Sequence, residues 1–192
     1  MQVSFLTSAV LSEQFPPLDR PEIAFAGKSN VGKSSLINRL INSRKLARTS
    51  SKPGRTRSIN FFSVGKTIYF TDLPGYGYAS VSLHTRRNWK KLVEIYLKER
   101  INLKAVVVII DIRRKAGEDD FNLLNWLKMF KIKSIIVLTK IDKLSKNRAH
   151  KQIDSISKEL INEGLDYPIA FSAKTGQGKH ELWEKINEIC GL

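Results

Sequence analysis

The segment from Gly27 to Ser34 constrains the fold of this chain more than any other part of the sequence. It reads GKSNVGKS and fits the pattern G-x-x-x-x-G-K-[ST]. A short apolar run, residues 22–26, precedes it, and residues 33–42 carry apolar side chains at helical spacing. Such a loop between a strand and a helix points backbone N–H groups at phosphate oxygens, and the helix adds the positive end of its dipole. The sequence therefore predicts a phosphate-binding loop in an α/β domain.

The residues of this loop have separate expected roles. Lys33 is expected to reach the β- and γ-phosphates of a nucleotide, and the Ser34 hydroxyl to bind Mg²⁺. The other candidate nucleotide contacts in and next to the loop are Gly27, Lys28, Ser29, Asn30, Val31, Gly32 and Ser35.

The order of the apolar segments indicates strands that alternate with helices. Strands are predicted at residues 22–26, 59–64, 67–71, 103–110, 134–138 and 168–171, and helices at 33–42, 86–100, 119–130, 148–163 and 179–189. This pattern is typical of an α/β P-loop NTPase three-layer sandwich: a mostly parallel sheet with one antiparallel edge strand and helices on both faces. The sequence holds no repeat, linker or low-complexity tract, so residues 1–192 are expected to form a single domain.

A second candidate motif, Asp72-Leu73-Pro74-Gly75, ends the second strand of a predicted hairpin. A carboxylate that leaves the sheet there lies beside the phosphate loop, so Asp72 is a candidate to hold the hydration shell of Mg²⁺. The Gly75 N–H is expected to contact the γ-phosphate, so that the loop after it senses this group. Alone, D-x-P-G fits an ordinary turn equally well. Its spacing after the phosphate loop favours nucleotide binding by all four residues.

Two motifs further along predict which base is bound. Thr139-Lys140-Ile141-Asp142 follows an apolar strand, and its last carboxylate can accept hydrogen bonds from the N1–H and N2–H₂ groups of guanine, a donor pair that adenine lacks. The Lys140 stem can lie over the base. Alone, this motif fits a solvated turn better. Ser172-Ala173-Lys174 after the last strand changes that balance, because the Ala173 N–H can donate to guanine O6 and both motifs lie where open α/β sheets bind ligands.

The loop after the first predicted helix, residues 44–58, contains Pro53-Gly54-Arg55-Thr56. Thr56 is the candidate there for a Mg²⁺ ligand and a γ-phosphate contact, with Gly54 and Arg55 beside the nucleotide. The loop is expected to order with GTP and to loosen after hydrolysis. Thr49 is a nearby alternative, and the Pro-Gly-Arg context favours Thr56.

These segments together resemble one particular family. EIAFAGKSNVGKSSLIN, PGRTRSINFF, DLPGYGYA, TKID and FSAK closely resemble the EngB (YihA/YsxC) GTPases, over nearly the whole chain. The residues that also fit are Ser8-Ala9, Trp89, Tyr96-Leu97 and Asp111-Ile112-Arg113. The resemblance implies a bacterial GTPase of the translation-factor-related class, with a role in assembly of the large ribosomal subunit and a link to cell division and septation. Thr139 stands where most GTPases have asparagine, and the EngB family itself has threonine there.

The sequence also bears on hydrolysis. Many small GTPases place a glutamine directly after D-x-x-G to orient the attacking water, whereas this chain has Tyr76. Residues 77–79 offer no substitute, so we expect slow intrinsic hydrolysis that a partner or a cation accelerates. In related GTPases an asparagine at the position of Asn30 helps to bind K⁺; the alternative is a side chain that stabilises the loop. The candidate catalytic residues are Asn30, Lys33, Thr56 and Gly75.

The charge distribution suggests a polyanionic partner. Lys and Arg number 33 against 18 Asp and Glu, a net charge of +15, and residues 23–71 contain no acidic side chain. The basic residues that nucleotide binding does not explain are Arg44, Lys45, Arg48, Lys52, Arg55 and Arg57 in the predicted switch loop, with Arg86, Arg87, Lys90 and Lys91 in the next helix. Ribosomal RNA or a large-subunit precursor fits this basic switch surface. The alternative is a well-solvated, lysine-rich surface without a partner.

Other features of the sequence narrow the class of protein. The single cysteine, Cys190, cannot form an internal disulfide, and no segment resembles a secretory signal or a membrane span. We therefore expect a cytoplasmic protein, monomeric and without a membrane partner. Two other functions stay open: a P-loop ATPase or small-molecule kinase, which would leave Asp142 and Ala173 unexplained, and an RNA-binding module with a vestigial nucleotide site.

Overall fold

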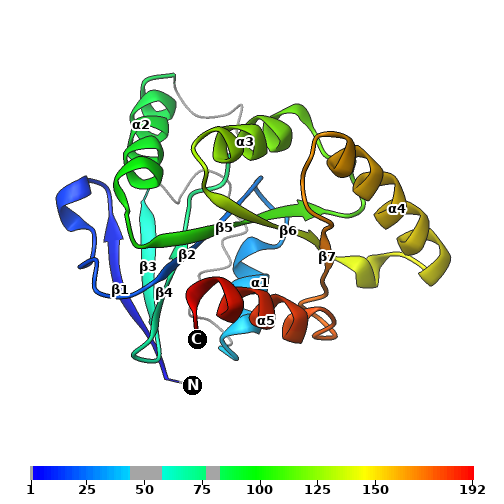
Figure 1. The fold of residues 1–192 in the computed structure, drawn as a ribbon, viewed down its shortest axis with the longest axis horizontal. Helices are drawn as coiled ribbons and strands as arrows, with labels where there is room; N and C mark the ends of the chain where they lie inside the picture. Colours follow the sequence, from blue (N-terminus) through cyan, green and yellow to red (C-terminus); the bar gives the residue numbers. More distant parts are fainter. Residues whose placement is uncertain (1, 44–57, 77–82) are drawn as a thin grey trace.

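The computed structural model describes residues 2–43, 58–76 and 83–192, although not the side chains of residues 83–90. In these ranges one seven-stranded sheet has the order β1-β3-β4-β2-β5-β6-β7 (Figure 1). Its strands are β1 (Val3–Ala9), β2 (Glu22–Gly27), β3 (Ile59–Val64), β4 (Ile68–Asp72), β5 (Leu103–Asp111), β6 (Lys133–Thr139) and β7 (Ile169–Ala170). Strands β4, β2, β5, β6 and β7 are parallel to one another.

The antiparallel part of the sheet lies at one edge, where β3 pairs antiparallel with β4 on one side and with β1 on the other. The predicted mostly parallel α/β class with an antiparallel edge is therefore confirmed. Strand β1 was not among the predicted strands. Its pairing register shifts between Phe5 and Thr7, which breaks the alternation that would mark a strand in the sequence.

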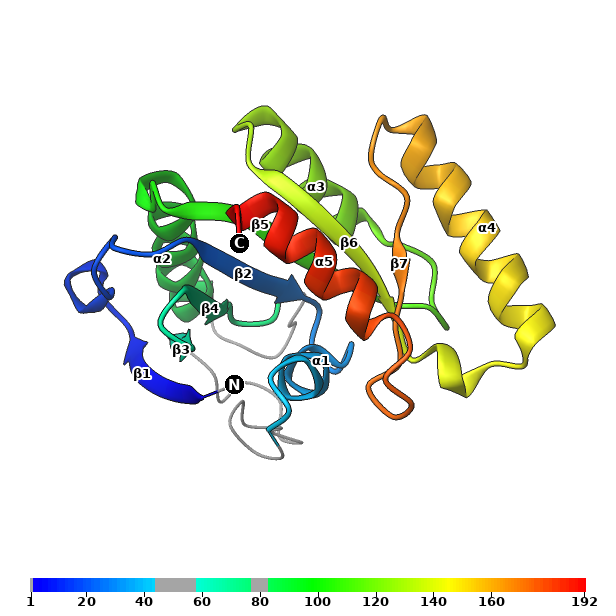
Figure 2. The ribbon, with the colours of Figure 1, turned by 60° about the horizontal axis from the view of Figure 1, so that its bottom comes forward.

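Helices cover both faces of the sheet. They are α1 (Lys33–Leu40), α2 (Leu83–Glu99), α3 (Glu118–Met129), α4 (Lys146–Asn162) and α5 (Lys179–Cys190), with single turns of 3₁₀-helix, η1 and η2, at Ser12–Gln14 and Ile141–Lys143. Helices α1 and α5 lie side by side on one face, where Leu36 and Leu182 join the same buried apolar cluster (Figure 2). Helices α2, α3 and α4 cover the other face around Tyr96, Leu124 and Leu160.

Most predicted elements are confirmed within a few residues of their bounds, and the differences have local causes. Helix α4 begins at Lys146 rather than at residue 148, because the Ser145 carbonyl already accepts the first helical hydrogen bond from the Ala149 N–H at 2.8 Å. Helix α1 ends at Leu40, and Asn42 then takes a left-handed conformation with φ of 53°.

The carboxyl ends of β2, β4, β5 and β6 lie at the same edge of the sheet because these strands are parallel. This brings Gly27, Asp72, Asp111 and Thr139, the last residues of these strands, into one region. Within the described ranges, no helix has the length and apolar composition that crossing a membrane requires.

Candidate nucleotide site

The predicted phosphate loop forms a tight turn from β2 into α1. Gly27 fits because a Cβ there would lie 2.9 Å from both the Ile109 carbonyl oxygen and Val31 Cγ2. Gly32 has φ of 106°, a conformation that favours glycine, and its carbonyl accepts the Leu36 N–H at 2.8 Å. The buried Val31 side chain, 5% exposed, anchors the middle of the loop in the core.

The loop and the D-x-P-G segment meet, as the sequence predicted. Lys33 Nζ forms an ion pair with the Asp72 carboxylate, and both side chains are largely buried. A Cβ at Gly75 would lie 3.3 Å from the Gly27 carbonyl oxygen and from Ser29 N, so glycine permits this close packing. Leu73 is buried below, and its N–H donates to the Phe25 carbonyl at 3.0 Å. Pro74, between Leu73 and Gly75, is buried as well.

The oxygen donors at this junction fit a magnesium ion. Ser34 lies in the first turn of α1, directly after Lys33, whose ammonium group contacts Asp72 at the end of β4. Mg²⁺ usually keeps several waters and takes one or two protein oxygens together with substrate phosphates. Across residues 2–43, 58–76 and 83–192, no cluster of three or more His, Cys, Asp or Glu side chains could hold a metal ion. Gly54, Arg55 and Thr56 lie outside the described residues, and their roles stay predictions.

Thr139 connects the predicted guanine motif to the phosphate loop. Its hydroxyl donates to the Val31 carbonyl at 2.6 Å and lies 3.2 Å from the Ile110 carbonyl. Threonine is 3% exposed at this position, where its hydroxyl supplies the hydrogen bond that ties β6 to the loop. Threonine, in place of the commoner asparagine, therefore still connects the guanine motif to the phosphate loop.

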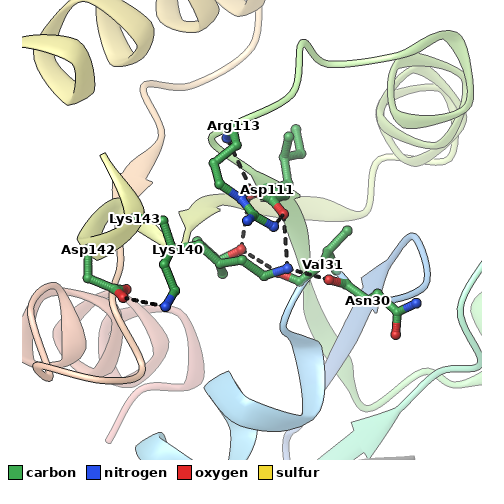
Figure 3. A network of polar contacts seen from close by, with 9 residues as sticks. Asn30, Val31, Asp111, Arg113, Lys140, Asp142 and Lys143 are labelled. Carbon is green, nitrogen blue, oxygen red and sulfur yellow. Dashed lines mark hydrogen bonds and ion pairs between the residues drawn. The ribbon is translucent and has the colours of Figure 1, made fainter. Parts of the chain in front are cut away.

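Lys140 makes the second connection. Its Nζ donates to the Asn30 carbonyl and pairs with Asp111 Oδ2 at 2.9 Å, as Figure 3 shows. A Cβ at Gly32 would lie 3.6 Å from Lys140 Cε, so the lysine stem crosses the loop. The Asn30 side chain is exposed and points away from Lys140, and the residue has φ of 62°, which asparagine tolerates better than most residues.

Asp111 is held by Arg113 as well as by Lys140. The guanidinium donates from Nε to Oδ1 at 3.0 Å and from Nη2 to Oδ2 at 2.8 Å, and the Arg113 N–H donates to Oδ1 at 3.1 Å. Burial raises the pKa of Asp111, but the hydrogen bonds from Arg113 and Lys140 outweigh it and lower the pKa to about 2. The carboxylate is therefore charged at neutral pH and fixes the Lys140 ammonium above the loop.

This low pKa predicts a pH dependence of stability. Because the pKa of Asp111 is lower in the folded protein than its ordinary value of 3.8, its contribution is complete above about pH 4 and disappears as the pH falls through about 2. The free energy of unfolding of an Asp111→Asn variant should fall less than that of the wild type over this interval, in urea titrations. The exposed Asp166 provides the control substitution Asp166→Asn. Equal pH dependence in Asp111→Asn and wild type would contradict the assignment.

Asp142 is oriented by Ser172. The Ser172 hydroxyl donates to Asp142 Oδ1 at 2.8 Å, and its oxygen accepts the Thr175 N–H at 3.1 Å. Ser172 is fully buried, whereas its neighbours Ala173 and Lys174 reach the surface of a pocket of about 620 Å³. This volume suits a nucleoside-sized ligand. The pocket is lined by Gly32, Ser35, Asn38, Arg39, Asn42, Ser43, Thr139, Lys140, Asp142, Lys143, Ala173 and Lys174.

The pocket therefore joins the phosphate loop to both base-reading motifs. The sequence motifs did not include Asn38, Arg39, Asn42 or Lys143, which reach the pocket from the end of α1 and from η2. Helical periodicity marked the buried stripe of α1, and only the folded structure shows which of its polar residues line the pocket.

Comparison with known proteins agrees with this geometry. The profile of a family described as 50S ribosome-binding GTPase matches residues 22–140. A probable GTP-binding protein EngB from Shouchella clausii is 48% identical, over 93% of this chain and 90% of its own length. The same protein from Geotalea daltonii is 48% identical, over 97% of this chain and 90% of its own length. The chain belongs to the EngB family of GTP-binding proteins.

Solved structures place this EngB-family chain among the P-loop GTPases. A crystal structure of a probable GTP-binding protein EngB superposes with a TM-score of 0.70 and 25% identity, over 88% of this chain and 98% of that one. A structure of Era in complex with MgGDPNP and a segment of 16S ribosomal RNA gives a TM-score of 0.66 and 26% identity, over 88% of this chain and 56% of Era. The chain is thus a GTPase that binds GTP and GDP, related to the ribosome-biogenesis GTPases.

Proposed function

We propose that this EngB-family GTPase acts as a GTP-controlled switch in assembly of the large ribosomal subunit, and that the family link to cell division and septation extends to it. One observation supports the switch most strongly. Thr139 and Lys140 bind the carbonyls of Val31 and Asn30, so the part of the site that selects the base also holds the part that surrounds the phosphates. The description of the family as 50S ribosome-binding and the net charge of +15 support the ribosomal partner.

The residues of the site have separate roles in nucleotide binding. Backbone N–H groups of residues 27–34 surround the phosphates, and Lys33 exchanges Asp72 for the β- and γ-phosphates when GTP binds. Asp142 and the Ala173 N–H select guanine. The Lys28 side chain contacts α3, so the contribution of this residue to phosphate binding comes from its backbone.

Magnesium would be held by Ser34, Asp72 and Thr56, and when bound it offsets the negative charge of the phosphates. The protein itself supplies the other contacts with the γ-phosphate. The loop amides and Lys33 stabilise its charge, and Gly75 contacts it through its N–H. Residues 1–192 form a single G domain in this proposal, and the protein acts as a cytoplasmic monomer.

Hydrolysis in this scheme is slow unless a partner or K⁺ accelerates it, because Tyr76 offers no base at the position of the water-orienting glutamine. We expect GTP hydrolysis to be at least several-fold faster in K⁺ than in Na⁺ at equal ionic strength, and Asn30→Ala to remove the difference. Phosphate release measured in both salts tests this. Equal rates in the two salts would exclude K⁺ as an activator.

The ribosomal partner is tested by sedimentation with large-subunit particles. We expect more protein to bind with a non-hydrolysable GTP analogue than with GDP, because the basic residues lie around the predicted switches. If six or more of these residues contact phosphates, affinity should fall about 10³-fold or more between 50 and 200 mM salt. Binding that does not change with salt would contradict an RNA interface.

Both alternatives make different predictions. A P-loop ATPase or small-molecule kinase would allow ATP to compete with labelled GTP, whereas Asp142 should exclude ATP. An RNA-binding module with a vestigial site would bind ribosomal particles equally with any nucleotide. The nucleotide dependence of sedimentation therefore separates it from the switch.

A further inference from the structure

Asp120, in the first turn of α3, accepts hydrogen bonds from separate parts of the chain. Its Oδ2 accepts from Lys28 Nζ at 3.0 Å and from the Gly117 N–H at 2.8 Å, and its Oδ1 accepts from the Tyr76 hydroxyl at 2.9 Å. The side chain is nearly buried, because Asp120 is 3% exposed. The phosphate loop, the residue after Gly75 and the start of α3 therefore meet at one carboxylate.

The backbone brings the same segments together. Lys28 and Tyr76 are neighbours through an isolated parallel β-bridge. Gly75 packs against Ser29 with the close approach described above. Gly117 leaves room for the Lys28 ammonium group, because a Cβ at position 117 would lie 2.6 Å from Lys28 Nζ. Glycine at 117 thus lets the lysine reach α3, and Tyr76 runs beside the phosphate loop rather than away from it.

The Tyr76 hydroxyl always acts as the hydrogen-bond donor in its contact with Asp120. Burial raises the pKa of the phenol far above its ordinary value, and the negative charge of Asp120 raises it further. The hydroxyl therefore stays protonated at any physiological pH. A hydrogen bond to a charged acceptor biases an equilibrium by about 10- to 100-fold, which is enough to favour one arrangement of Tyr76 over another.

We propose that Asp120 is a positioning residue of the GTPase cycle. By holding Tyr76 and Lys28 together on α3, it shifts the equilibrium between the GTP-bound and GDP-bound arrangements towards the GDP-bound one. The inference rests on the proposed function of the site, in which the Gly75 N–H contacts the γ-phosphate. Because Tyr76 is the next residue, drawing Gly75 towards that phosphate pulls the phenol from Asp120. GDP lacks the γ-phosphate and leaves the contact intact. Asp120 therefore favours GDP and makes α3 part of the switch.

The test compares the affinities for a non-hydrolysable GTP analogue and for GDP, measured by calorimetry with Mg²⁺. Tyr76→Phe removes only the hydroxyl, and Asp120→Asn weakens its acceptor, so each should raise the ratio of analogue to GDP affinity by about 10-fold. The double variant should raise the ratio no more than either change alone, since both remove the same interaction.

Two matched controls isolate the contact. Tyr69→Phe removes another phenol that donates to a carboxylate, Asp19, at 2.8 Å and away from the site. Asp119→Asn removes the weaker partner of Lys28, 3.7 Å away, and keeps the Tyr76 contact. Both should leave the ratio unchanged, whatever they do to unfolding in urea.

The outcomes separate this inference from the function on which it rests. If wild-type protein binds both nucleotides and the ratio in Tyr76→Phe and Asp120→Asn equals the wild-type ratio, Asp120 is structural only and the inference is wrong. If the wild type binds neither nucleotide, the proposed function itself fails.

Discussion

An Asp142→Asn variant is expected to bind GTP about 10²- to 10⁴-fold more weakly than the wild type, because two hydrogen bonds to a charged acceptor are replaced by one to a neutral oxygen and one repulsive donor–donor contact. The carboxylate can accept from both N1–H and N2–H₂ of guanine, whereas the asparagine amide turns one donor towards another donor. Ser172 can still donate to the remaining carbonyl oxygen of the variant, so the fold around residue 142 should persist. Calorimetry with GTP and Mg²⁺ measures the loss.

The same variant should gain affinity for xanthosine triphosphate. Xanthine carries a carbonyl oxygen at C2, which the asparagine NH₂ can bind while its oxygen accepts from N1–H. Asp166→Asn on the exposed surface is the matched control and should bind GTP like the wild type. If a folded Asp142→Asn protein bound both GTP and xanthosine triphosphate weakly, Asp142 would contribute to binding in a way other than recognition of the base.

A Lys33→Met variant is expected to hydrolyse GTP roughly 10²- to 10³-fold more slowly at saturating nucleotide, the typical effect of removing one group that stabilises transition-state charge. Methionine keeps most of the length and volume of the side chain. It also leaves Asp72 without its ion pair, so urea unfolding should be measured in parallel to confirm that the variant is folded.

The control for this prediction is Lys158→Met, which removes an exposed lysine from α4. It should hydrolyse GTP at the wild-type rate, as phosphate release will show. A folded Lys33→Met protein with an unchanged rate would mean that the lysine contributes to the Asp72 ion pair and not to the reaction.

Much of the fold could be predicted because the central strands are buried on both faces and appear in the sequence as unbroken apolar runs. Strands β5 and β6 are of this kind, and their predicted bounds differ from the observed ones by a residue or two. Strand β1 lies at the edge, with Phe5 and Leu6 exposed and its register shifted, so it carries neither an apolar run nor a clean alternation. Its identity depends on pairing with β3, which is distant in sequence.

The candidate site divides in the same way. The phosphate loop and the guanine motifs are local patterns whose chemistry depends on spacing within a few residues, and the structure places them at one edge of the sheet. Asp120 could not be found in this way, because its partner Lys28 is 92 residues distant and an acidic residue in the first turn of a helix is common for other reasons. The ordering of Lys140 by Asp111 likewise appears only once β5 and β6 are adjacent.

We propose that one pocket binds a triphosphate through the loop at 27–34 and selects guanine through Asp142. Calorimetric titration of the purified protein with GTP, GDP and ATP, in the presence of Mg²⁺, tests it most directly. We expect heat and one saturable site for both guanine nucleotides, and none for ATP over the same concentrations. No heat with GTP and GDP, or equal affinity for ATP, would contradict it.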